Sequence, residues 1–243
     1  MHIDILADVI CPWCFIGKRR LERALALRPD LSATLSWRAF ELNPDLPIEG
    51  IPREIYLSAK FGSATKAERL YAAIAAAGRA EGIEFAFERI RHTPNTLRAH
   101  RLIRLAGDKG CAEPVVEALF QAYFIEGLDI GLTETLGELA GRAGLGRAET
   151  LEYLRGDAGT AEVRADQHLA RRLGIHAVPY FVLARDYAIS GAQEPEMFLP
   201  IFDIAAGIVE PAPAELASAR KTAKTARGGF FASAVWHGSS SLP

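Results

Sequence analysis

The chain has 243 residues, of which 49% are hydrophobic and 24% are charged, and its formal net charge at pH 7 is -2. This balance is ordinary for a globular protein, and it argues against a basic nucleic-acid surface or a polybasic membrane anchor. No apolar run approaches the roughly 20 residues of a membrane-spanning helix, and no leader-like pattern precedes the first predicted strand. We therefore expect a cytoplasmic protein with no nucleic-acid or membrane partner.

The N-terminal segment predicts a strand, a helix and a second strand. Residues 2–10 carry apolar side chains on both faces, which is typical of a central strand covered by helices on either side. A helix is expected from about Pro12 to Leu27, because proline is favoured at a first helical position. Residues 34–42 alternate and predict the second strand.

The rest of the chain predicts a helical block followed by a hairpin. From about residue 52 to 173 the pattern is helical throughout, and this block is too long to be a loop. Residues 177–191 contain two short β runs around Arg185 and Asp186, which predict a hairpin. A last helix is expected over 194–207, with Pro200 as a kink or an early stop. The two ends of the chain can then form one sheet with covering helices.

Two cysteines lie at the junction of the first strand and the first helix. The chain has three cysteines, Cys11, Cys14 and Cys111, too few for a disulfide framework. A helix N-terminus lowers the pKa of a cysteine from about 8.5 into the range of roughly 3.5 to 7.5. The first helical turn brings Cys14 beside Cys11. We therefore expect Cys11 to be an exposed nucleophile and Cys14 a buried resolving thiol.

Two other interpretations of the pair are weaker. A zinc site would need two more ligands, and the sequence has no second CxxC. Cys111 and some of the histidines would have to converge without motif spacing, the histidines being His2, His92, His100, His168, His176 and His237. The pair could also be two inert buried residues. The strand-to-helix context favours a redox or thiol-binding pair, and we expect no metal.

Several stretches together resemble a known family. The strand, CPWC and helix of residues 3–27, and "GIHAVPYFVL" at 174–183, resemble the two signatures of the DsbA family of thioredoxin-fold oxidoreductases. "DVICPWCFIGKRRLE", "WRAFELNP", "PNTLRAHRL", "AYFIEGLDI" and "YAISGAQ" occur in the order of its FrnE-like branch. That branch neighbours the 2-hydroxychromene-2-carboxylate isomerases and the kappa-class glutathione transferases. The resemblance covers about residues 2–207.

The resemblance implies an α/β, thioredoxin-like fold with a large all-helical, DsbA-like insertion. Residues 1–50 and 174–207 would form the thioredoxin-like domain, 51–173 the insertion, and 208–243 a disordered C-terminal tail. It also implies a cis bond between Val178 and Pro179, facing the cysteines. Independently, a proline within a strand removes a ladder donor, so the backbone of Val178 is left to pair with a partner peptide.

The implied function is thiol–disulfide exchange through CPWC, with Cys11, Cys14 and Pro179 as the catalytic residues. The substrate is a disulfide- or thiol-containing protein or small molecule, with no tightly bound cofactor and with glutathione as a candidate co-substrate. A second hypothesis is a glutathione-dependent isomerase or transferase acting on a small aromatic or polyketide-like molecule. A third is a redox-sensing interaction protein. The direction of electron flow and the oligomeric state stay open.

Six residues are predicted to contact the substrate. Trp13 offers a flat apolar face, and Val178 offers its backbone. Asn95 is similar to an asparagine near the active site of the relatives, although it could simply cap the helix that follows. Ser190, Gly191 and Gln193 form a turn. In the relatives this turn lies where the γ-glutamyl end of glutathione binds, although it could equally be a simple turn.

The sequence departs from the family pattern at the position of a buried acid. Typical thioredoxins carry an acid six residues before the first cysteine as a proton relay, and here that residue is Ile5. Asp4 and Asp8 flank it and are expected to point away or to lie nearer the surface, so water would serve instead. Because Trp13 carries no charge, the helix terminus is expected to contribute most of the thiolate stabilisation.

Overall fold

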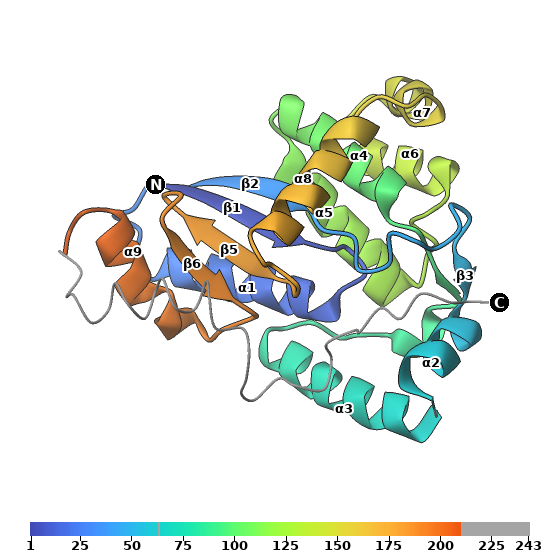
Figure 1. Cartoon of the computed structure of the whole chain (residues 1–243), viewed down its shortest axis with the longest axis horizontal. Helices are drawn as coiled ribbons and strands as arrows, with labels where there is room; N and C mark the ends of the chain where they lie inside the picture. The colour runs from blue at the N-terminus through green and yellow to red at the C-terminus, as the bar shows by residue number, and fades with distance from the viewer. Residues whose placement is uncertain (63, 210–243) are drawn as a thin grey trace.

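The protein is built around a four-stranded sheet, in a computed structural model that describes residues 1–62 and 64–209 (Figure 1). The strands follow the order β2-β1-β5-β6, with bounds of His2–Ala7 for β1, Thr34–Ala39 for β2, Tyr180–Leu183 for β5 and Tyr187–Ser190 for β6. β1 pairs parallel with β2 and antiparallel with β5. Ile5 therefore lies between Trp37 and Phe181, and β1 is the central strand that its apolar faces predict.

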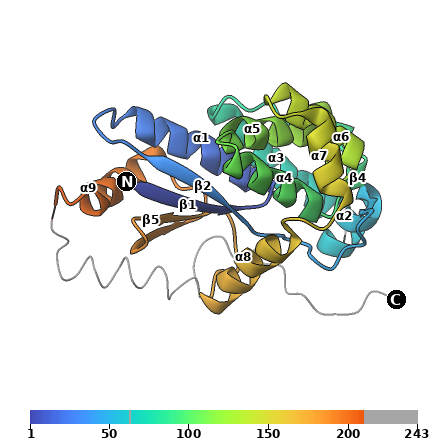
Figure 2. The same cartoon turned by 90° about the horizontal axis from the view of Figure 1, so that it is seen from above.

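Helices cover both faces of this sheet. Figure 2 shows α1 (Pro12–Ala26) on one side and α8 (Thr160–Arg172) on the other. The last helix, α9 (Leu199–Ala205), follows the hairpin β5–β6 after a 3-10 turn at Pro195–Met197. The predicted α/β architecture, in which the N-terminal strands and the hairpin of residues 180–190 share one sheet, is therefore confirmed.

The remaining helices gather at one end of the sheet (Figure 1). They are α2 (Arg53–Phe61), α3 (Ala64–Ala80), α4 (Leu97–Asp108), α5 (Ala112–Gln121), α6 (Thr133–Arg142) and α7 (Arg147–Arg155), with a 3-10 turn at Phe87–Arg89 and a π-helical turn at Ala122–Glu126. The expected helical insertion is thus present. Its exact boundaries with the sheet domain stay a prediction, and residues 210–243 of the expected tail lie outside the described residues.

The prediction that residues 52–173 are helical throughout is wrong at one place. Two short strands, β3 (Ile51–Pro52) and β4 (His92–Thr93), form an antiparallel pair. The backbone before β3 turns tightly at Gly50, whose φ is +74°, and a Cβ atom there would lie 2.5 Å from the carbonyl oxygen of Thr93. Glycine is required because no larger residue tolerates both that φ and that approach.

Three element boundaries also differ from the prediction. β1 ends at Ala7 rather than at residue 10, because the next residues turn: the N–H of Cys11 donates to the Asp8 carbonyl over 3.0 Å. β2 ends at Ala39 rather than at residue 42. Pro200 lies in the first turn of α9 and does not end it, since proline is tolerated where the N–H has no helical partner.

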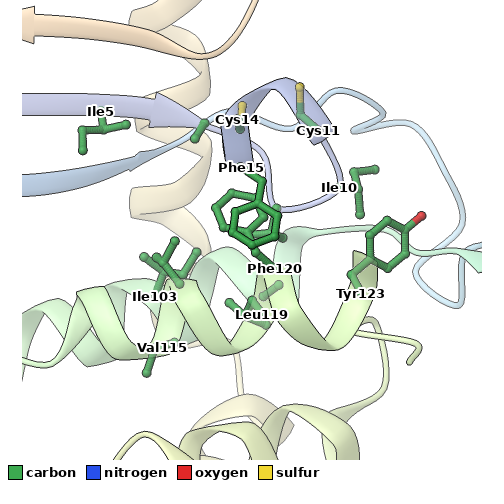
Figure 3. Close-up of a cluster of buried hydrophobic side chains, with 14 of the residues drawn as sticks. Ile5, Ile10, Cys11, Cys14, Phe15, Ile103, Val115, Leu119, Phe120 and Tyr123 are labelled. Atoms are coloured by element: carbon green, nitrogen blue, oxygen red, sulfur yellow. The ribbon is translucent and has the colours of Figure 1, made fainter. Parts of the chain in front are cut away.

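The cysteine-bearing helix is fixed to the helical block by aromatic stacking. Phe15 is fully buried and stacks on Phe120 of α5, with ring centroids 4.9 Å apart and planes 5° from parallel (Figure 3). The same view shows both cysteine sulfurs at the start of α1, on the side away from these rings. The packing therefore holds the N-terminus of α1 in a fixed place.

Candidate active site

Cys11 and Cys14 lie at the N-terminus of α1. Cys11 is the N-cap residue, with extended backbone angles of φ -92° and ψ 112°, and Pro12 begins the helix. The carbonyl of Cys11 accepts the N–H of Cys14 over 3.0 Å, which closes the first turn. Both residues are free thiols in this structure. The predicted placement of the pair at the strand-to-helix junction is present.

The two thiols differ in acidity. The hydrogen bond from the Cys14 side chain lowers the pKa of Cys11, with further help from the N–H of Cys14 and the charge of Lys60, against the opposing effects of burial and Asp8. Burial raises the pKa of Cys14 well above its ordinary value, and its hydrogen bond to Cys11 adds to this effect. Cys11 is therefore the residue suited to be a thiolate, and Cys14 the residue suited to stay protonated.

Two expectations about the pair need correction. Cys11 is only 6% exposed and not an open nucleophile, because its sulfur faces the carbonyl of Val178 at 3.7 Å. The helix terminus also does not contribute most of the acidity of Cys11, since the thiol of Cys14 is the larger influence. The Cys14 thiol donates to the Cys11 sulfur, whereas the helix contributes the N–H of Cys14.

The segment before β5 lies against the cysteine pair. The Val178–Pro179 peptide bond is cis. Pro179 packs on α1 at Gly17, where a Cβ atom would lie 2.7 Å from Pro179 Cγ. Within the described residues, no hydrogen bond uses the N–H of Val178. The Val178 backbone therefore keeps a donor for an extended chain laid beside it.

Asp8, in the turn that leads to Cys11, forms a buried pair with His100. Asp8 is 0% exposed and His100 is 4% exposed, and Asp8 Oδ1 lies 3.4 Å from His100 Nε2. Of the two alternatives expected for Asp8, a place nearer the surface is therefore wrong. The turn after β1 rotates its carboxylate inward, where it accepts the N–H of Leu42 over 2.7 Å.

The other residues predicted to contact the substrate lie in different surroundings. Trp13 is half-buried against the core next to the cysteines. The amide of Asn95 is used inside the fold, since it donates to the Leu46 carbonyl over 2.9 Å and accepts the N–H of Leu97 over 3.0 Å. This matches the alternative in which Asn95 supports the helix start.

The turn after β6 is connected to the cis peptide. Gly191 donates its N–H to the carbonyl of Pro179 over 2.8 Å. Gln193 Nε2 donates to the carbonyl of Ser190 over 2.8 Å. Ser190, Gly191 and Gln193 are all half-buried. The turn thus stands beside the Val178–Pro179 segment, and its own hydrogen bonds define its shape.

Sequence reasoning missed Gly17, Lys60 and the Asp8–His100 pair as parts of this site. A glycine inside a helix costs about 1 kcal/mol relative to alanine, so its presence within α1 was a detectable signal of close packing. Lys60 carried no such signal, because its approach to Cys11 depends on how α2 packs. His100 carried one only through its place in the "PNTLRAHRL" stretch.

Residues 1–62 and 64–209 contain neither a metal-binding cluster nor a membrane-spanning helix. No group of three or more His, Cys, Asp or Glu side chains in these residues is arranged to hold a metal ion. His237, one of the histidines considered for a zinc site, lies outside them. In the same residues, no helix has both the length and the apolar character needed to cross a membrane.

Known proteins share this fold and this sequence pattern. Residues 2–202 match the family described as a DSBA-like thioredoxin domain. A solved structure from Streptomyces coelicolor, described as a probable DsbA oxidoreductase, is 35% identical with a TM-score of 0.79, and the match covers 87% of this chain and 92% of that one.

Two more distant structures share the fold alone. A 2-hydroxychromene-2-carboxylate isomerase is 20% identical with a TM-score of 0.62, over 89% of this chain and 99% of that one. The cytosolic disulfide reductase DsbM from Pseudomonas aeruginosa is 18% identical with a TM-score of 0.63, over 86% and 100% of the two chains. The family expectation is confirmed by the match over residues 2–202: the chain belongs to the DSBA-like thioredoxin domain family.

Proposed function

We propose that this protein is a thiol–disulfide oxidoreductase in which Cys11 attacks the substrate and Cys14 resolves the intermediate. The observation that carries the proposal is the opposite acidity of the two thiols at one helix start: the pKa of Cys11 is lowered and that of Cys14 is raised. An attacking thiol must be ionised, and a resolving thiol must wait until the intermediate forms.

The exchange takes place in two steps. The Cys11 thiolate attacks one sulfur of a substrate disulfide, the substrate S–S bond breaks, and one substrate thiolate leaves and takes a proton. The thiol of Cys14 then loses its proton and attacks the sulfur of Cys11. A Cys11–Cys14 disulfide forms, and the second substrate thiol is released. The substrate gains two electrons and two protons, and the enzyme loses them; the reverse sequence oxidises a dithiol.

Pro179, Val178 and Trp13 are proposed to align the substrate. The Val178 N–H points to no partner in the described chain, so it can pair with an extended substrate backbone. The Cys11 sulfur lies 3.7 Å from the Val178 carbonyl, so a backbone docked there would bring a neighbouring sulfur to Cys11. Trp13 would cover the apolar part of such a substrate.

Glutathione is proposed as a co-substrate, held by Ser190, Gly191 and Gln193. This turn is bonded to the Pro179 carbonyl, so a peptide on Val178 would reach it. A second structure of DsbM contains glutathione and is 18% identical to this chain with a TM-score of 0.57. DsbM is described as a cytosolic reductase. The cytosol is reducing and contains glutathione, which is consistent with this proposal. We propose that Asn95 supports the site only indirectly, because its side chain holds the start of α4.

Two assays, insulin reduction and the formation of a mixed disulfide at Cys11, test the proposal. The wild-type protein should catalyse the reduction of insulin by a dithiol, and Cys11→Ser should abolish this activity. Cys14→Ser should stop after the first step and accumulate a mixed disulfide at Cys11, visible by mass spectrometry. The matched control is Cys111→Ala, since Cys111 is the N-cap of α5 and lies outside the pair.

The same variants separate the oxidoreductase from a glutathione-dependent isomerase or transferase. An isomerase that uses a glutathione thiolate needs no resolving thiol, and a serine at residue 14 could still donate to the sulfur of Cys11. Turnover of an aromatic substrate panel that survives in Cys14→Ser, together with no insulin reduction by the wild type, would replace our proposal with this second function.

A further inference from the structure

Behind the cysteine pair, a buried carboxylate and a buried imidazole face each other. Asp8 belongs to the turn after β1 and His100 to the first turn of α4, and their facing atoms are 3.4 Å apart. Burying two ionisable groups is costly, even when they are paired. A pair kept at such a cost, with Asp8 in the turn that leads directly to Cys11, calls for a chemical explanation.

Asp8 lies in the turn that leads to the cysteine pair, where its carbonyl accepts the N–H of Cys11 over 3.0 Å, and its carboxylate is held in place. Its Oδ2 accepts the N–H of Leu42 over 2.7 Å, and its Oδ1 lies 3.5 Å from the N–H of Ile10. Burial and the hydrogen bond to Cys11 are the larger reasons for the raised pKa of Cys14, and the Asp8 charge adds to them. Asp8 is thus fixed within electrostatic reach of the thiol that must lose a proton late in the cycle.

His100 connects this carboxylate to a cavity on the far side. A cavity of about 510 Å³ lies between β2, α4 and α8, and His100 lines it together with Ala7, Val9 and Asp166. A space of this size, lined in part by charged side chains, has room for water. Within the described part of the chain, His100 Nε2 lacks a well-aligned hydrogen bond, although Asp8 is near.

The groups that face His100 are mostly acidic. Burial by itself lowers the pKa of His100, but Asp8, Glu41 after β2, and Asp166 of α8 outweigh this and raise it above its ordinary value. Arg164 and Arg171 of α8 act on Glu41, and Arg38 and Arg104 line the same cavity as His100. Histidine is a side chain that can hold and pass on a proton, and the acidic neighbours favour its protonated form here.

We propose that Asp8 and His100 form a proton relay that connects Cys14 to the cavity beside β2. The inference rests on the proposed oxidoreductase function. In the resolving step, the Cys14 thiol passes its proton to the Asp8 carboxylate and attacks the sulfur of Cys11. The Cys11–Cys14 bond forms, the bond from Cys11 to the substrate sulfur breaks, and the substrate thiolate leaves. His100 then passes the proton between Asp8 and the cavity.

The sign of the Asp8 effect distinguishes a relay from a simple charge. As a fixed negative charge, Asp8 raises the pKa of Cys14 and hinders its ionisation. Removing that charge should then leave resolution unchanged or make it faster. As a proton acceptor, Asp8 speeds the same step, and its removal should slow resolution even though the pKa of Cys14 falls. General acid–base groups typically contribute a factor of about 100 to 10,000 in rate.

A single-turnover experiment with the full reduced protein measures the two steps separately. An aromatic disulfide whose thiolate absorbs visible light releases one thiolate when Cys11 attacks and a second when Cys14 resolves. In Asp8→Asn we expect an unslowed first release and a second release at least about tenfold slower at pH 7. Titration of the Cys11→Ser and Asp8→Asn, Cys11→Ser proteins should show that the pKa of Cys14 is lower without Asp8.

Control variants keep each outcome interpretable. Glu113→Gln removes another carboxylate that lines the cavity but contacts Trp37 instead of His100, and it should leave both releases within about twofold. His100→Ala should slow the second release, and added imidazole should restore it. Slowing without restoration would overturn the role of His100. If Asp8→Asn fails to fold, as judged by near-UV circular dichroism, His100→Ala carries the test.

Failure of the relay differs from failure of the oxidoreductase function. If the wild-type protein gives no first release, the proposed function is wrong. If the first release is normal and Asp8→Asn resolves as fast as or faster than the wild type, Asp8 is only a charge beside the thiols and the relay is wrong.

Discussion

The ring of Pro179 lies directly against the backbone of Gly17, so closely that a Cβ atom at Gly17 would be 2.7 Å from Pro179 Cγ and 3.3 Å from Phe181 Cζ. Gly17 belongs to α1, which begins at the cysteine pair, and Pro179 follows Val178, whose carbonyl faces the Cys11 sulfur. This contact therefore sets the distance between the helix of the thiols and the segment proposed to hold the substrate.

The first prediction concerns Gly17→Ala. The added methyl group must displace Pro179 or bend α1, and overpacking of this kind typically costs about 1–3 kcal/mol. The better helix propensity of alanine returns up to about 1 kcal/mol. We expect a net loss of about 1–2 kcal/mol in the free energy of unfolding, measured with urea, and a several-fold slower reduction of insulin.

Gly107→Ala is the matched control for this prediction. Gly107 also lies within a helix, α4, but a Cβ atom there would meet no atom within 4 Å. The substitution should stabilise the protein by about 0.5–1 kcal/mol and leave insulin reduction unchanged. Equal effects of the two substitutions would mean that the Gly17–Pro179 contact does not position the site.

A second prediction ranks the influences on Cys11. Because the Cys14 thiol is the largest of the effects that lower the pKa of Cys11, Cys14→Ala should raise that pKa more than Lys60→Ala does. Cys14→Ser should lie between the wild type and Cys14→Ala, since a hydroxyl can still donate to the sulfur. The ultraviolet absorbance of the thiolate, followed against pH, gives the pKa in each variant, with Cys111→Ala as the background.

A larger rise in Lys60→Ala than in Cys14→Ala would show that a charge, and not the neighbouring thiol, stabilises the thiolate. Lys60 Nζ donates to Tyr56 Oη over 2.6 Å, so Tyr56→Phe is a useful companion variant. It keeps the charge of Lys60 while removing the hydroxyl that positions it.

A third prediction links stability to pH through Glu117. Burial raises the pKa of this carboxyl, but hydrogen bonds from Arg19, Lys18 and Gln121 outweigh burial and lower the pKa to about 2 from an ordinary value of 4.5. A pKa lower in the folded state gives stability that is complete above about pH 4.5 and is lost as the pH falls toward 2. Glu117 thereby ties α5 to the cysteine helix α1.

Glu117→Gln should therefore cost about 1–2 kcal/mol at pH 7, a value reduced because the side chain is 29% exposed and solvent screens the pair. The difference from the wild type in urea unfolding should shrink as the pH is lowered from 4.5 toward 2. Glu149→Gln, which removes an exposed partner of Lys109, should change stability much less at any pH. A Glu117→Gln difference that does not vary with pH would contradict the assignment.

The parts of the site that the sequence predicts correctly are local ones. The placement of Cys11 and Cys14 follows from a strand that ends before a proline at a helix start, and all of this lies within a few consecutive residues. The central position of β1 follows from its two apolar faces. The two-residue strands β3 and β4 were missed because they are too short to show a period.

The parts that could not be predicted depend on distant contacts. Asp8 turns inward because its carboxylate accepts the N–H of Leu42. It can pair with His100 only because α4 packs behind the sheet. A single aspartate beside a strand is usually exposed, so the sequence alone favours the wrong placement. The shielding of Cys11 likewise depends on the Val178 segment, which is far away along the chain.

The last prediction concerns the proposed glutathione site. Gln193 closes the turn at Ser190, and Gly191 binds the Pro179 carbonyl, so the turn adjoins the proposed docking backbone of Val178. If the turn holds the charged amino-acid end of glutathione, Gln193→Ala in a Cys14→Ser background should weaken the capture of glutathione as a mixed disulfide at Cys11. The rate of capture, from glutathione disulfide at a series of concentrations, should fall several-fold, mainly through weaker binding.

Reaction of the same variant with insulin should change little, because insulin has no need of a γ-glutamyl site. An equal loss with both substrates would mean that Gln193 only maintains the shape of the turn, and the turn would then not be the glutathione site.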